Sequence, residues 1–464
     1  MRRFETLGEW LAWLSTLHPK QIDMSLERVS GVLERLGIAD PPYEVIAVGG
    51  TNGKGSCVAL LESIYLAGGY AVGAFMSPHL VAFNERIRFG GRDLGDAALI
   101  ELFELMDAAR GELTLSYFEA SAVAAMLHFA RASADVAVLE VGMGGRLDAV
   151  NALDADAALI VSVDLDHMDY LGPDRDAIGR EKAGIARPGR PVIVADREPP
   201  QGLVDEIARR GGELRLIGAD FSAEPISATP PRLGKRFVYR AGGLAERVFP
   251  PPAFGGRIQL ANAAAVVAVT DAMQARLPVA DEQIATGLET ARLRGRFERA
   301  FVTGGGTVTG VDTVTEGGGV TEGDGVTKGD GVTKGGLVGR VEWVFDVAHN
   351  PAAAALFHEA VTGLDPVPRT IAVFGAMADK DIAGVVRPFL DLVDAWFVGG
   401  LDSDRGADPE DVAALLRREG ARHVSVYDDI GAAAIAAIEA RADRALAFGS
   451  FYTVGPAMKA VGLY

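Results

Sequence analysis

The sequence holds a single cysteine, Cys57, among its 464 residues, so no disulfide can form within the chain. That scarcity is typical of proteins in a reducing compartment, and we expect a cytoplasmic protein. Long hydrophobic runs are also missing, since no stretch of about eighteen apolar residues is free of charge. The N-terminal segment carries Glu5 and Glu9 in an amphipathic pattern rather than the apolar core of a secretory signal. We therefore expect no association with a membrane.

Basic residues are outnumbered, with 45 Lys and Arg against 63 Asp and Glu and a net charge of −18. Nucleic-acid backbones require a basic protein surface, so we expect no nucleic-acid partner. An anionic small substrate is compatible with this balance, because backbone amides, single Lys or Arg side chains and Mg²⁺ can create a local positive field.

Short apolar segments alternate with helical patterns along most of the chain. The segments that are almost continuously apolar, as in strands buried on both faces of a parallel sheet, are 43–49, 71–76, 135–142 and 157–163. Helical patterns lie between them, for example at 56–67 and 118–133. This alternation predicts an α/β domain with a mostly parallel, doubly wound sheet of the phosphate-loop ATPase kind.

A second alternation follows and predicts a smaller, Rossmann-like α/β domain. Its expected strands are 341–347, 370–375, 394–400 and 444–450, with helices from Pro351, after Asp381, and twice between the last two strands. We place the domains at 1–294 and 295–464. Residues 303–340 contain the repeat GVTEGD-GVTKGD-GVTKGG, which is too small and glycine-rich to pack a core. We expect a flexible hairpin insertion there, with a repeated binding element as the alternative.

Residues 49–58, GGTNGKGSCV, join a predicted buried strand to a predicted helix. The glycines permit backbone conformations that let several N–H groups point at one phosphate, at the positive end of the helix. Lys54 would reach the β- and γ-phosphates, and Ser56 could bind Mg²⁺. The loop departs from the usual motif, because Val48 stands where the first glycine belongs and Gly55 separates Lys54 from Ser56. A glycine-rich turn without a ligand is the alternative, and the lysine and hydroxyl together favour phosphate binding.

Further polar side chains follow predicted strands at the same edge of the sheet. Ser77 is a candidate metal ligand, although composition alone favours a capping serine. Glu140 ends a buried strand, where a carboxylate is costly unless it is coupled to a cation such as Mg²⁺. His167 follows the next strand. Lys182, taken by itself, is typical of a solvated lysine on a helix.

The second domain has a similar strand end, where Asp346, His349 and Asn350 precede Pro351. Proline suits the first turn of a helix, so we expect a helix to begin there. Two α/β edges facing each other would make a natural cleft for a reaction with two substrates.

Taken together, these motifs resemble the ATP-dependent amide ligases that include the Mur ligases and the folate enzymes. The branch resembled most is that of the bacterial bifunctional dihydrofolate synthases/folylpolyglutamate synthases. The similarity runs through QIDMSLERV, GTNGKGS, SPHLVAFNERIR, LEVGMGGRLDAVN, DHMDYLGPDRDAIGREKAGI, FDVAHNP and GSFYTVG. The unusual phosphate loop is the family's own variant.

The resemblance implies that ATP converts a substrate carboxylate to an acyl phosphate, which the amine of L-glutamate then attacks. The implied acceptors are 7,8-dihydropteroate, giving dihydrofolate, and tetrahydrofolate with its polyglutamates. It also implies Mg²⁺, with a monovalent cation as a further candidate, and a monomer. The nearest alternative is a folylpolyglutamate synthase without the first activity. A Mur-type ligase is disfavoured because fewer than fifty residues precede the phosphate loop, and a guanine-nucleotide switch because no asparagine is followed by lysine.

The resemblance also assigns roles to individual residues. The catalytic residues are Lys54, Lys182, as a carbamylated lysine, and His349. The ATP-binding residues are Gly53, Lys54, Gly55, Ser56, Asn262, Arg296 and Asp346. The metal ligands are Ser56, Ser77, Glu140 and His167. The pterin-binding residues are Gln21, Ile22, Asp23, Met24, Ser116, Tyr117, Phe118, Glu119, Leu147, Asp148 and Ala149. The chain departs from the family's usual pterin pattern at Gln21, Met24 and Val150.

Overall fold

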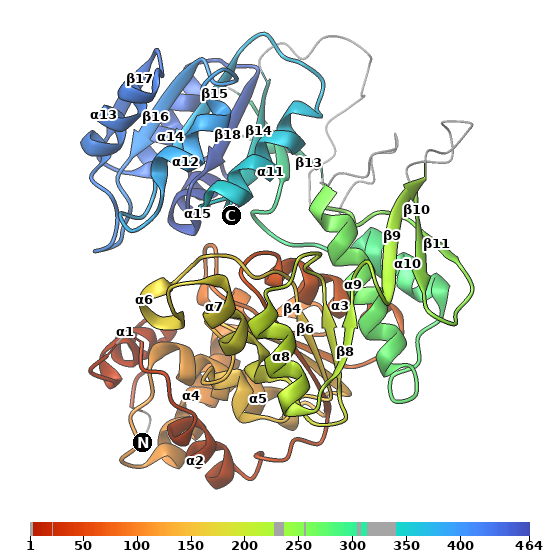
Figure 1. The fold of residues 1–464 in the computed structure, drawn as a ribbon. Coiled ribbons are helices and arrows are strands. Elements are labelled where there is room, and N and C mark those ends of the chain that lie inside the picture. The colour runs from red at the N-terminus through yellow and green to blue at the C-terminus, as the bar shows by residue number, and fades with distance from the viewer. Residues whose placement is uncertain (1–2, 21, 227–235, 255–256, 304–307, 313–339) are drawn as a thin grey trace. The chain divides into compact units, whose positions relative to one another are not determined.

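The computed structural model describes residues 3–20, 22–226, 236–254, 257–303, 308–312 and 340–464. The chain divides into two compact units (Figure 1). Unit 1 comprises Met1–Pro252 and Gln259–Arg292, and unit 2 comprises Ala253–Ile258 and Leu293–Tyr464. The domain boundary predicted at 294–295 lies close to the division between Arg292 and Leu293.

Unit 1 is built on an eight-stranded sheet with the order β4-β3-β2-β5-β1-β6-β7-β8. Its strands are β1 (Glu44–Gly49), β2 (Val72–Phe75), β3 (Ile87–Phe89), β4 (Arg92–Asp93), β5 (Val136–Glu140), β6 (Ala157–Ile160), β7 (Pro191–Val194) and β8 (Glu213–Leu216). Among the described strands of this sheet, β3 pairs antiparallel with both β2 and β4, and the other pairings are parallel. The predicted mostly parallel sheet is therefore confirmed, and the β3–β4 hairpin at its edge was not foreseen.

Helices of unit 1 overlap both predicted helical patterns, 56–67 and 118–133, and others occur elsewhere in the unit. The helices are α1 (Leu7–Leu17), α2 (Glu27–Leu36), α3 (Lys54–Ala67), α4 (Asp96–Arg110), α5 (Tyr117–Arg131), α6 (Met168–Leu171), α7 (Arg175–Lys182), α8 (Gln201–Arg210), α9 (Arg257–Met273) and α10 (Asp281–Thr290). Short 3₁₀ turns are η1 (Phe83–Arg86), η2 (Ala149–Ala152) and η3 (Ala183–Ile185). Neighbouring residues of β1 and β5 are buried alike although their side chains alternate between faces, so both faces of the sheet are covered.

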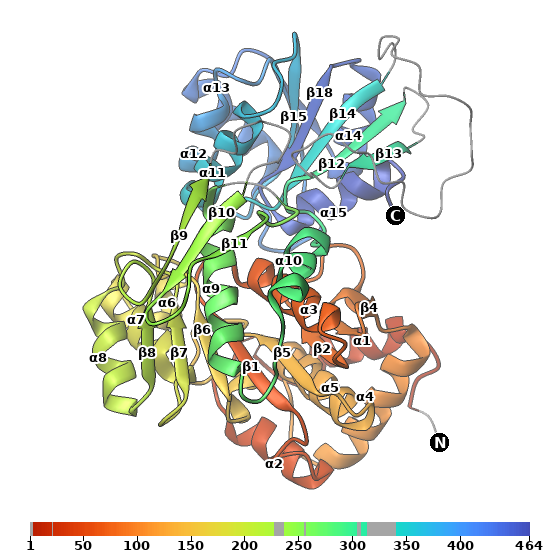
Figure 2. The same cartoon turned by 90° about the vertical axis from the view of Figure 1, so that its right-hand side faces the viewer.

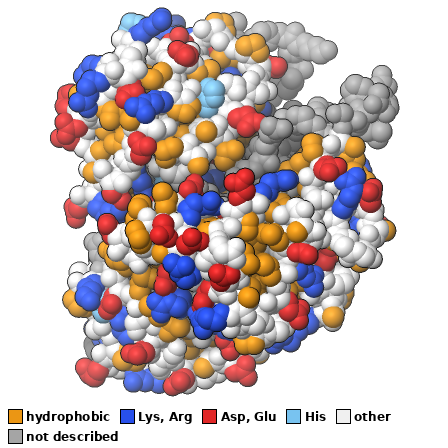
Figure 3. All heavy atoms as spheres, in the orientation of Figure 1, with side chains coloured by type: hydrophobic (Ala, Val, Ile, Leu, Met, Phe, Trp, Pro, Cys, Tyr) orange, Lys and Arg blue, Asp and Glu red, His pale blue; other side chains and the backbone are white. Residues whose placement is uncertain are grey.

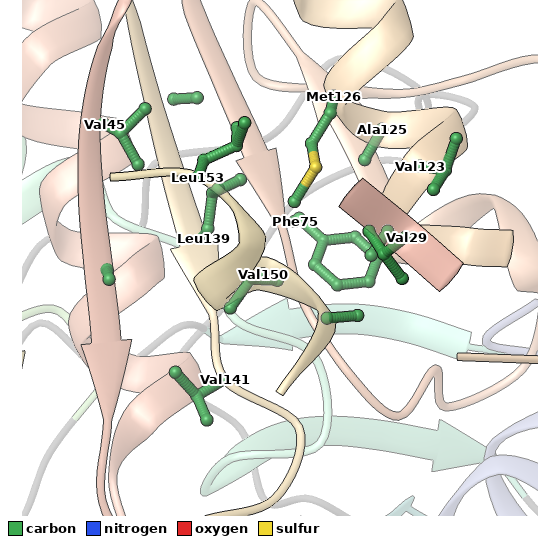
Figure 4. Close-up of a cluster of buried hydrophobic side chains, with 14 of the residues drawn as sticks. Val29, Val45, Phe75, Val123, Ala125, Met126, Leu139, Val141, Val150 and Leu153 are labelled. Atoms are coloured by element: carbon green, nitrogen blue, oxygen red, sulfur yellow. The ribbon is translucent and has the colours of Figure 1, made fainter. Parts of the chain in front are cut away.

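One face of the sheet packs on a hydrophobic cluster shared with α1, α2, α4 and α5. Figure 4 shows part of it, with Phe75 and Leu139 from the sheet, Met126 from α5 and Val150 from η2. Val150, one of the departures from the family's usual pattern, is thus a core residue. A valine there favours packing, because no hydroxyl needs a partner in the core.

A small antiparallel sheet was not predicted from the sequence. Its strands are β9 (Phe221–Ile226), β10 (Arg236–Ala241) and β11 (Arg247–Phe249). Figures 1 and 2 show α9 and α10 beside it. The hydroxyl of Tyr239 donates to Asp271 Oδ2 at 2.9 Å, and Arg247 pairs with the same carboxylate, which ties this sheet to α9.

Unit 2 contains a seven-stranded sheet with the order β13-β12-β14-β18-β15-β16-β17. The strands are β12 (Glu298–Thr303), β13 (Val308–Asp312), β14 (Arg340–Asp346), β15 (Thr370–Phe374), β16 (Ala395–Gly399), β17 (Val424–Tyr427) and β18 (Arg444–Phe448). The helices are α11 (Pro351–Thr362), α12 (Ile382–Val386), α13 (Pro409–Glu419), α14 (Ile430–Glu439) and α15 (Phe451–Ala460), with a 3₁₀ turn η5 (Arg387–Phe389). The pairings among β14 to β18 are parallel, as expected for a Rossmann-like domain.

Two details of unit 2 differ from the sequence-based expectation. Strand β17 lies between the two predicted helical stretches and was missed, because this short edge strand is only partly buried. The hairpin expected over 303–340 lies mostly outside the described residues. Within it, β13 pairs antiparallel with β12.

The described structure also shows the lengths of the helices and the distribution of charge on one face of the molecule. None of the helices in the described part of the chain is long and apolar enough to cross a bilayer. On the face shown in Figure 3, acidic and basic side chains are interspersed rather than gathered by sign.

The contact of α10 with α3 gives a test of the packing. A Cβ added to Gly287 of α10 would lie 2.4 Å from Ile64 Cα and 2.6 Å from Ile64 N, both backbone atoms. Gly287→Ala should therefore destabilise the protein by about 1–3 kcal/mol, although alanine is the better helix former. Urea unfolding measures the change.

The matched control is Gly8→Ala in α1, where an added Cβ would meet nothing within 4 Å. That variant should be stabilised slightly, by at most about 1 kcal/mol. Equal stabilisation of both variants would contradict the close helix packing.

Candidate functional site

The glycine-rich loop between β1 and α3 has the conformation that its sequence demands. Gly50 and Gly53 adopt φ values of 142° and 87°, which side-chain-bearing residues rarely take. A Cβ on Gly50 would lie 3.1 Å from the backbone nitrogens of Val161 and Ser162. The loop is therefore built against the segment that follows β6, and glycine is needed for both conformation and space.

Hydrogen bonds hold the loop to this segment. The Thr51 amide donates to Ser162 O at 2.8 Å, and the Asn52 amide donates to Ser162 Oγ at 3.0 Å. The Lys54 ammonium donates to the carbonyls of Gly50 and Thr51 at 3.0 and 3.2 Å. The cation predicted to bind phosphate thus lies against the loop that would surround the phosphate.

Helix α9 brings the predicted nucleotide contact Asn262 to the same loop. Its side chain is 1% exposed and lies 3.2 Å from the position that a Cβ of Gly53 would take. Asn262 Nδ2 donates to Gln259 Oε1 at 3.0 Å, which fixes the orientation of the amide. Asn262, which lies about two hundred positions after Gly53 in the sequence, therefore packs directly against the glycine-rich loop.

Two predicted metal ligands meet at the end of β5. The Ser77 amide donates to Glu140 Oε2 at 3.1 Å, and Glu140 is 4% exposed. His167 precedes α6 and has a φ of 50°, which is uncommon for residues other than glycine, and its ring Nε2 lies 3.8 Å from Asp166 Oδ2. Over the described ranges, no group of three or more His, Cys, Asp or Glu side chains could hold a metal ion by itself.

Lys182 is buried, with 4% of its surface exposed, so the solvated lysine suggested by its local sequence is wrong. Burial, together with a smaller contribution from the nearby Lys54 charge, lowers its pKa to about 7, although Asp166 and Asp148 oppose the shift. An appreciable fraction of this amine is therefore neutral near pH 7, unlike an ordinary lysine.

Close backbone packing explains how a charged helix end becomes buried. A Cβ on Gly184 would lie 2.3 Å from Arg146 Cα, and a Cβ on Gly145 would lie 2.8 Å from Glu181 O. The Arg146 amide also donates to Glu181 O at 2.9 Å. The loop after β5 thus lies directly on the end of α7 and covers Lys182.

Asp148 organises the predicted pterin segment Leu147–Ala149. Its carboxylate accepts the amides of Met143 at 2.9 Å and Val150 at 3.1 Å and caps η2. Burial raises the pKa of Asp148 to about 7 despite these bonds and the Lys54 charge. The aromatic ring of Phe118 occupies the space beside Gly142, where an added Cβ would come within 2.6 Å of it.

The remaining predicted pterin residues lie at the capped start of α5 and in the segment before α2. Ser116 and Glu119 make a reciprocal capping box at the start of α5, and Tyr117 lies under the guanidinium of Arg86 at 5.4 Å. Ile22, Asp23 and Met24 precede α2, while Gln21 lies outside the described residues.

Sequence reasoning missed two residues of this network, Arg28 and His18. The Arg28 guanidinium bonds to both Asp23 and Glu119, and His18 Nε2 lies 3.1 Å from Asp23 Oδ2. Arg28 stands within the quoted motif QIDMSLERV, which was the available signal.

In unit 2, two of the predicted residues, Arg296 and His349, lie near the ring of Phe451. The Arg296 guanidinium lies 5.7 Å from the Phe451 ring, and the His349 ring lies 6.4 Å from it. Asp346 accepts the amides of Phe297 and Ala348, each at 2.9 Å. Burial raises the pKa of Asp346, and the Arg296 charge opposes that rise.

The helix predicted from Pro351 is confirmed. Asn350 caps α11 by accepting the Ala353 amide at 2.9 Å, and Pro351 occupies the first turn. The cap fixes the loop that carries His349, whose Nδ1 lies 2.9 Å from Val347 O.

Comparison with known proteins matches two family models. The Mur ligase middle domain matches residues 48–270, and the Mur ligase, glutamate ligase domain matches residues 333–451. The dihydrofolate synthase/folylpolyglutamate synthase of Escherichia coli (strain K12) is 38% identical over 457 residues, which cover 98% of this chain and 95% of that protein.

Solved structures agree with this comparison. E. coli FolC in complex with DHPP and ADP has 35% sequence identity and a TM-score of 0.81, covering 99% of this chain and 98% of that one. A bifunctional folylpolyglutamate synthase/dihydrofolate synthase with Mn, AMPPNP and L-glutamate bound has 34% identity and a TM-score of 0.81, covering 99% of both chains.

The glycine geometry predicts how the loop responds to a methyl group. In Gly53→Ala, the added Cβ would lie 2.9 Å from Val161 Cγ1 in a left-handed conformation. We expect ATP affinity, measured by titration calorimetry, to fall about tenfold or more, since this strain is of order 1–2 kcal/mol.

Gly69→Ala is the control, because Gly69 also has a left-handed φ, of 84°, but an added Cβ there meets nothing within 4 Å. It should lower thermal stability while leaving ATP affinity unchanged. Unchanged affinity in Gly53→Ala would contradict phosphate binding by this loop.

Proposed function

The chain belongs to the Mur ligase family, and on that premise we infer that it is an ATP-dependent ligase that joins L-glutamate to folate substrates. The acceptors are 7,8-dihydropteroate, which yields dihydrofolate, and tetrahydrofolate with its polyglutamates. The observation that carries this assignment is the 38% identity to a dihydrofolate synthase/folylpolyglutamate synthase over 98% of the chain. The glycine loop, with Asn262 beside it, supports the use of ATP.

The reaction must make a poor acyl donor reactive. The γ-phosphoryl group of ATP passes to an oxygen of the substrate carboxylate, and ADP leaves. The glutamate amine then forms a bond to the acyl carbon, the bond from that carbon to the phosphorylated oxygen breaks, and phosphate leaves as the nitrogen loses a proton. No covalent bond to the protein is needed, so the protein positions the reactants and balances charge.

The residues at the end of β5 fit a magnesium ion that arrives with ATP. Mg²⁺ commonly uses one or two carboxylates and completes its coordination with phosphate oxygens and water. Glu140 supplies a buried carboxylate with Ser77 beside it, and we propose that Ser56 and His167 complete the protein's share. When bound there, the ion would neutralise charge on the transferring phosphoryl group.

We propose that Lys182 is carbamylated. Its neutral amine can add to CO₂, forming an N–C bond and releasing one proton, which leaves an anionic carbamate. As a cation, Lys182 is disfavoured by burial and by Lys54. As a carbamate, it would be attracted to Lys54, so the same neighbour that lowers the amine's pKa favours the modified form.

In unit 2, we propose that Arg296 and Asp346 bind ATP and that His349 lies near its phosphates. Arg296 and His349 both lie near the ring of Phe451, and the carboxylate of Asp346, at the end of β14, accepts the Phe297 amide. These contacts support the proposal. We further propose a cytoplasmic monomer, on the single cysteine and on the family resemblance.

Phosphate release tests the function directly. With ATP, Mg²⁺ and L-glutamate, the protein should release phosphate on addition of dihydropteroate, and separately of tetrahydrofolate, with product masses that show one added glutamate. Activity on tetrahydrofolate alone would leave only the folylpolyglutamate synthase. If neither acceptor causes phosphate release, the assignment is wrong.

Replacement of the buried lysine tests the carbamate. Lys182→Ala should lower the ligation rate about 100-fold or more while ATP binding stays measurable, because a residue that supports bound charge is lost. Carbon-13 NMR of wild-type protein in labelled bicarbonate should show a carbamate signal that the variant lacks.

The control is Lys459→Ala, since Lys459 is exposed on α15.

The carbamate should also depend on pH. Because the neutral fraction of the Lys182 amine increases as pH rises through about 7, carbamate formation should increase over the same range at fixed dissolved CO₂. A fully active Lys182→Ala variant would rule out the carbamate role.

A further inference from the structure

We propose that Arg28 is a positioning residue for the pteroate and folate substrates, because its guanidinium fixes the segment Ile22–Met24 against the start of α5. The proposal rests on the proposed function, since it concerns the acceptor that the ligase binds.

The guanidinium joins two parts of the chain that are remote in sequence. Arg28 Nη1 donates to Asp23 Oδ2 at 2.9 Å, and Nη2 donates to Asp23 O at 2.7 Å and to Glu119 Oε1 at 2.8 Å. The Arg28 side chain is 16% exposed, and that of Glu119 is 5% exposed. A planar fork with several donors suits this arrangement, whereas a lysine ammonium would act as a single point charge.

The segment that Arg28 holds has no regular secondary structure of its own. Between the end of α1 at Leu17 and the start of α2 at Glu27, the described residues form neither helix nor strand. The conformation around Asp23 therefore depends on side-chain contacts. Besides Arg28, these include His18, whose two ring nitrogens lie 3.1 Å from Asp23 Oδ2 and 2.8 Å from Thr114 Oγ1.

Arg28 is the positive charge that holds this network together. Asp23 and Glu119 both bond to the same guanidinium, and without it two carboxylates would stand near each other with one of them buried. Removing one partner of a buried ion pair leaves an uncompensated charge, which destabilises the arrangement of the remaining groups.

Glu119 connects Arg28 to the start of α5, because it also takes part in the cap of that helix. Its Oε2 accepts the Ser116 amide at 2.7 Å, and its own amide donates to Ser116 Oγ at 3.3 Å. Tyr117 and Phe118, two of the predicted pterin contacts, lie inside this capping box. One cation thus joins two of the three predicted pterin segments, while the phosphate loop is held by other contacts, with Ser162.

Loss of the Arg28 guanidinium should weaken acceptor binding and leave nucleotide binding intact. A segment that is already ordered binds its ligand without a further entropic cost, and a loosened segment must be ordered at each binding event. In Arg28→Ala we expect the KM for dihydropteroate and for tetrahydrofolate to rise about tenfold or more, with the KM for ATP unchanged. Arg28→Lys should recover only part of this loss, since it keeps the charge and loses the fork.

Arg35→Ala is the matched control. Arg35 lies on the same helix and bridges to the carbonyls of Ala109 and Arg110, at the end of α4. It should lower the unfolding temperature without a change in the KM for either acceptor. If Arg28→Ala fails to fold, the KM values of Arg28→Lys and Glu119→Gln decide the question, and both should be raised for the acceptors alone.

Failure of the ligase function and failure of the positioning role of Arg28 would give different results. A wild-type protein without glutamate-dependent phosphate release would remove the proposed function and this inference with it. An active wild type whose folded Arg28 variants keep a normal acceptor KM, or lose ATP and acceptor affinity equally, would overturn the positioning role alone.

Discussion

The site in unit 1 depends on the pairing of β1 between β5 and β6. Val48 lies opposite Glu140 in β5, and Gly49 lies opposite Ile160 in β6. Since the three strands run parallel, their carboxyl ends meet at one edge of the sheet, where ligands of open α/β sheets bind. A shift by one residue would turn Glu140 to the other face and separate the glycine loop from Ser162. Every other contact of the site builds on this register.

Charge burial is the second constraint, and it opposes stability. Lys182 has its pKa lowered to about 7, so between about pH 7 and 10 the unfolded chain binds a proton that the folded chain does not. Asp148 has its pKa raised to about 7, so between about pH 4 and 7 the folded chain holds a proton that the unfolded chain has released. Stability therefore falls toward pH 7 from both sides for this pair. A protein keeps such groups where their chemistry is used, which agrees with a ligase that must bind highly charged substrates.

Local patterns in the sequence were sufficient for the central strands, for the glycine loop and for the helix beginning at Pro351. Each of these depends on a few adjacent residues whose backbone preferences agree with the fold. The burial of Lys182 was beyond such reasoning, because the sequence of α7 is strongly polar and the covering contacts come from Gly145 and Arg146. The bridge from Arg28 to Glu119 joins residues 91 positions apart, so no local pattern marks it. The small sheet of β9 to β11 was missed because its strands are only partly buried and so lack a continuous apolar run.

A common device explains how these loops keep their shape at the ends of strands. Glu140 accepts an amide from Ser77, Asp148 accepts amides from Met143 and Val150, and Asp346 accepts amides from Phe297 and Ala348. Glu140 and Asp148 are buried and Asp346 is partly buried, and each uses backbone N–H groups in place of water, which holds the loop around it. Carboxylates have several lone pairs, so those that accept one or two amides retain the capacity to bind a cation or a donor group. The hydrogen bonds that order these loops therefore leave carboxyl oxygens available to a ligand, and that links the folding of the loops to their proposed function.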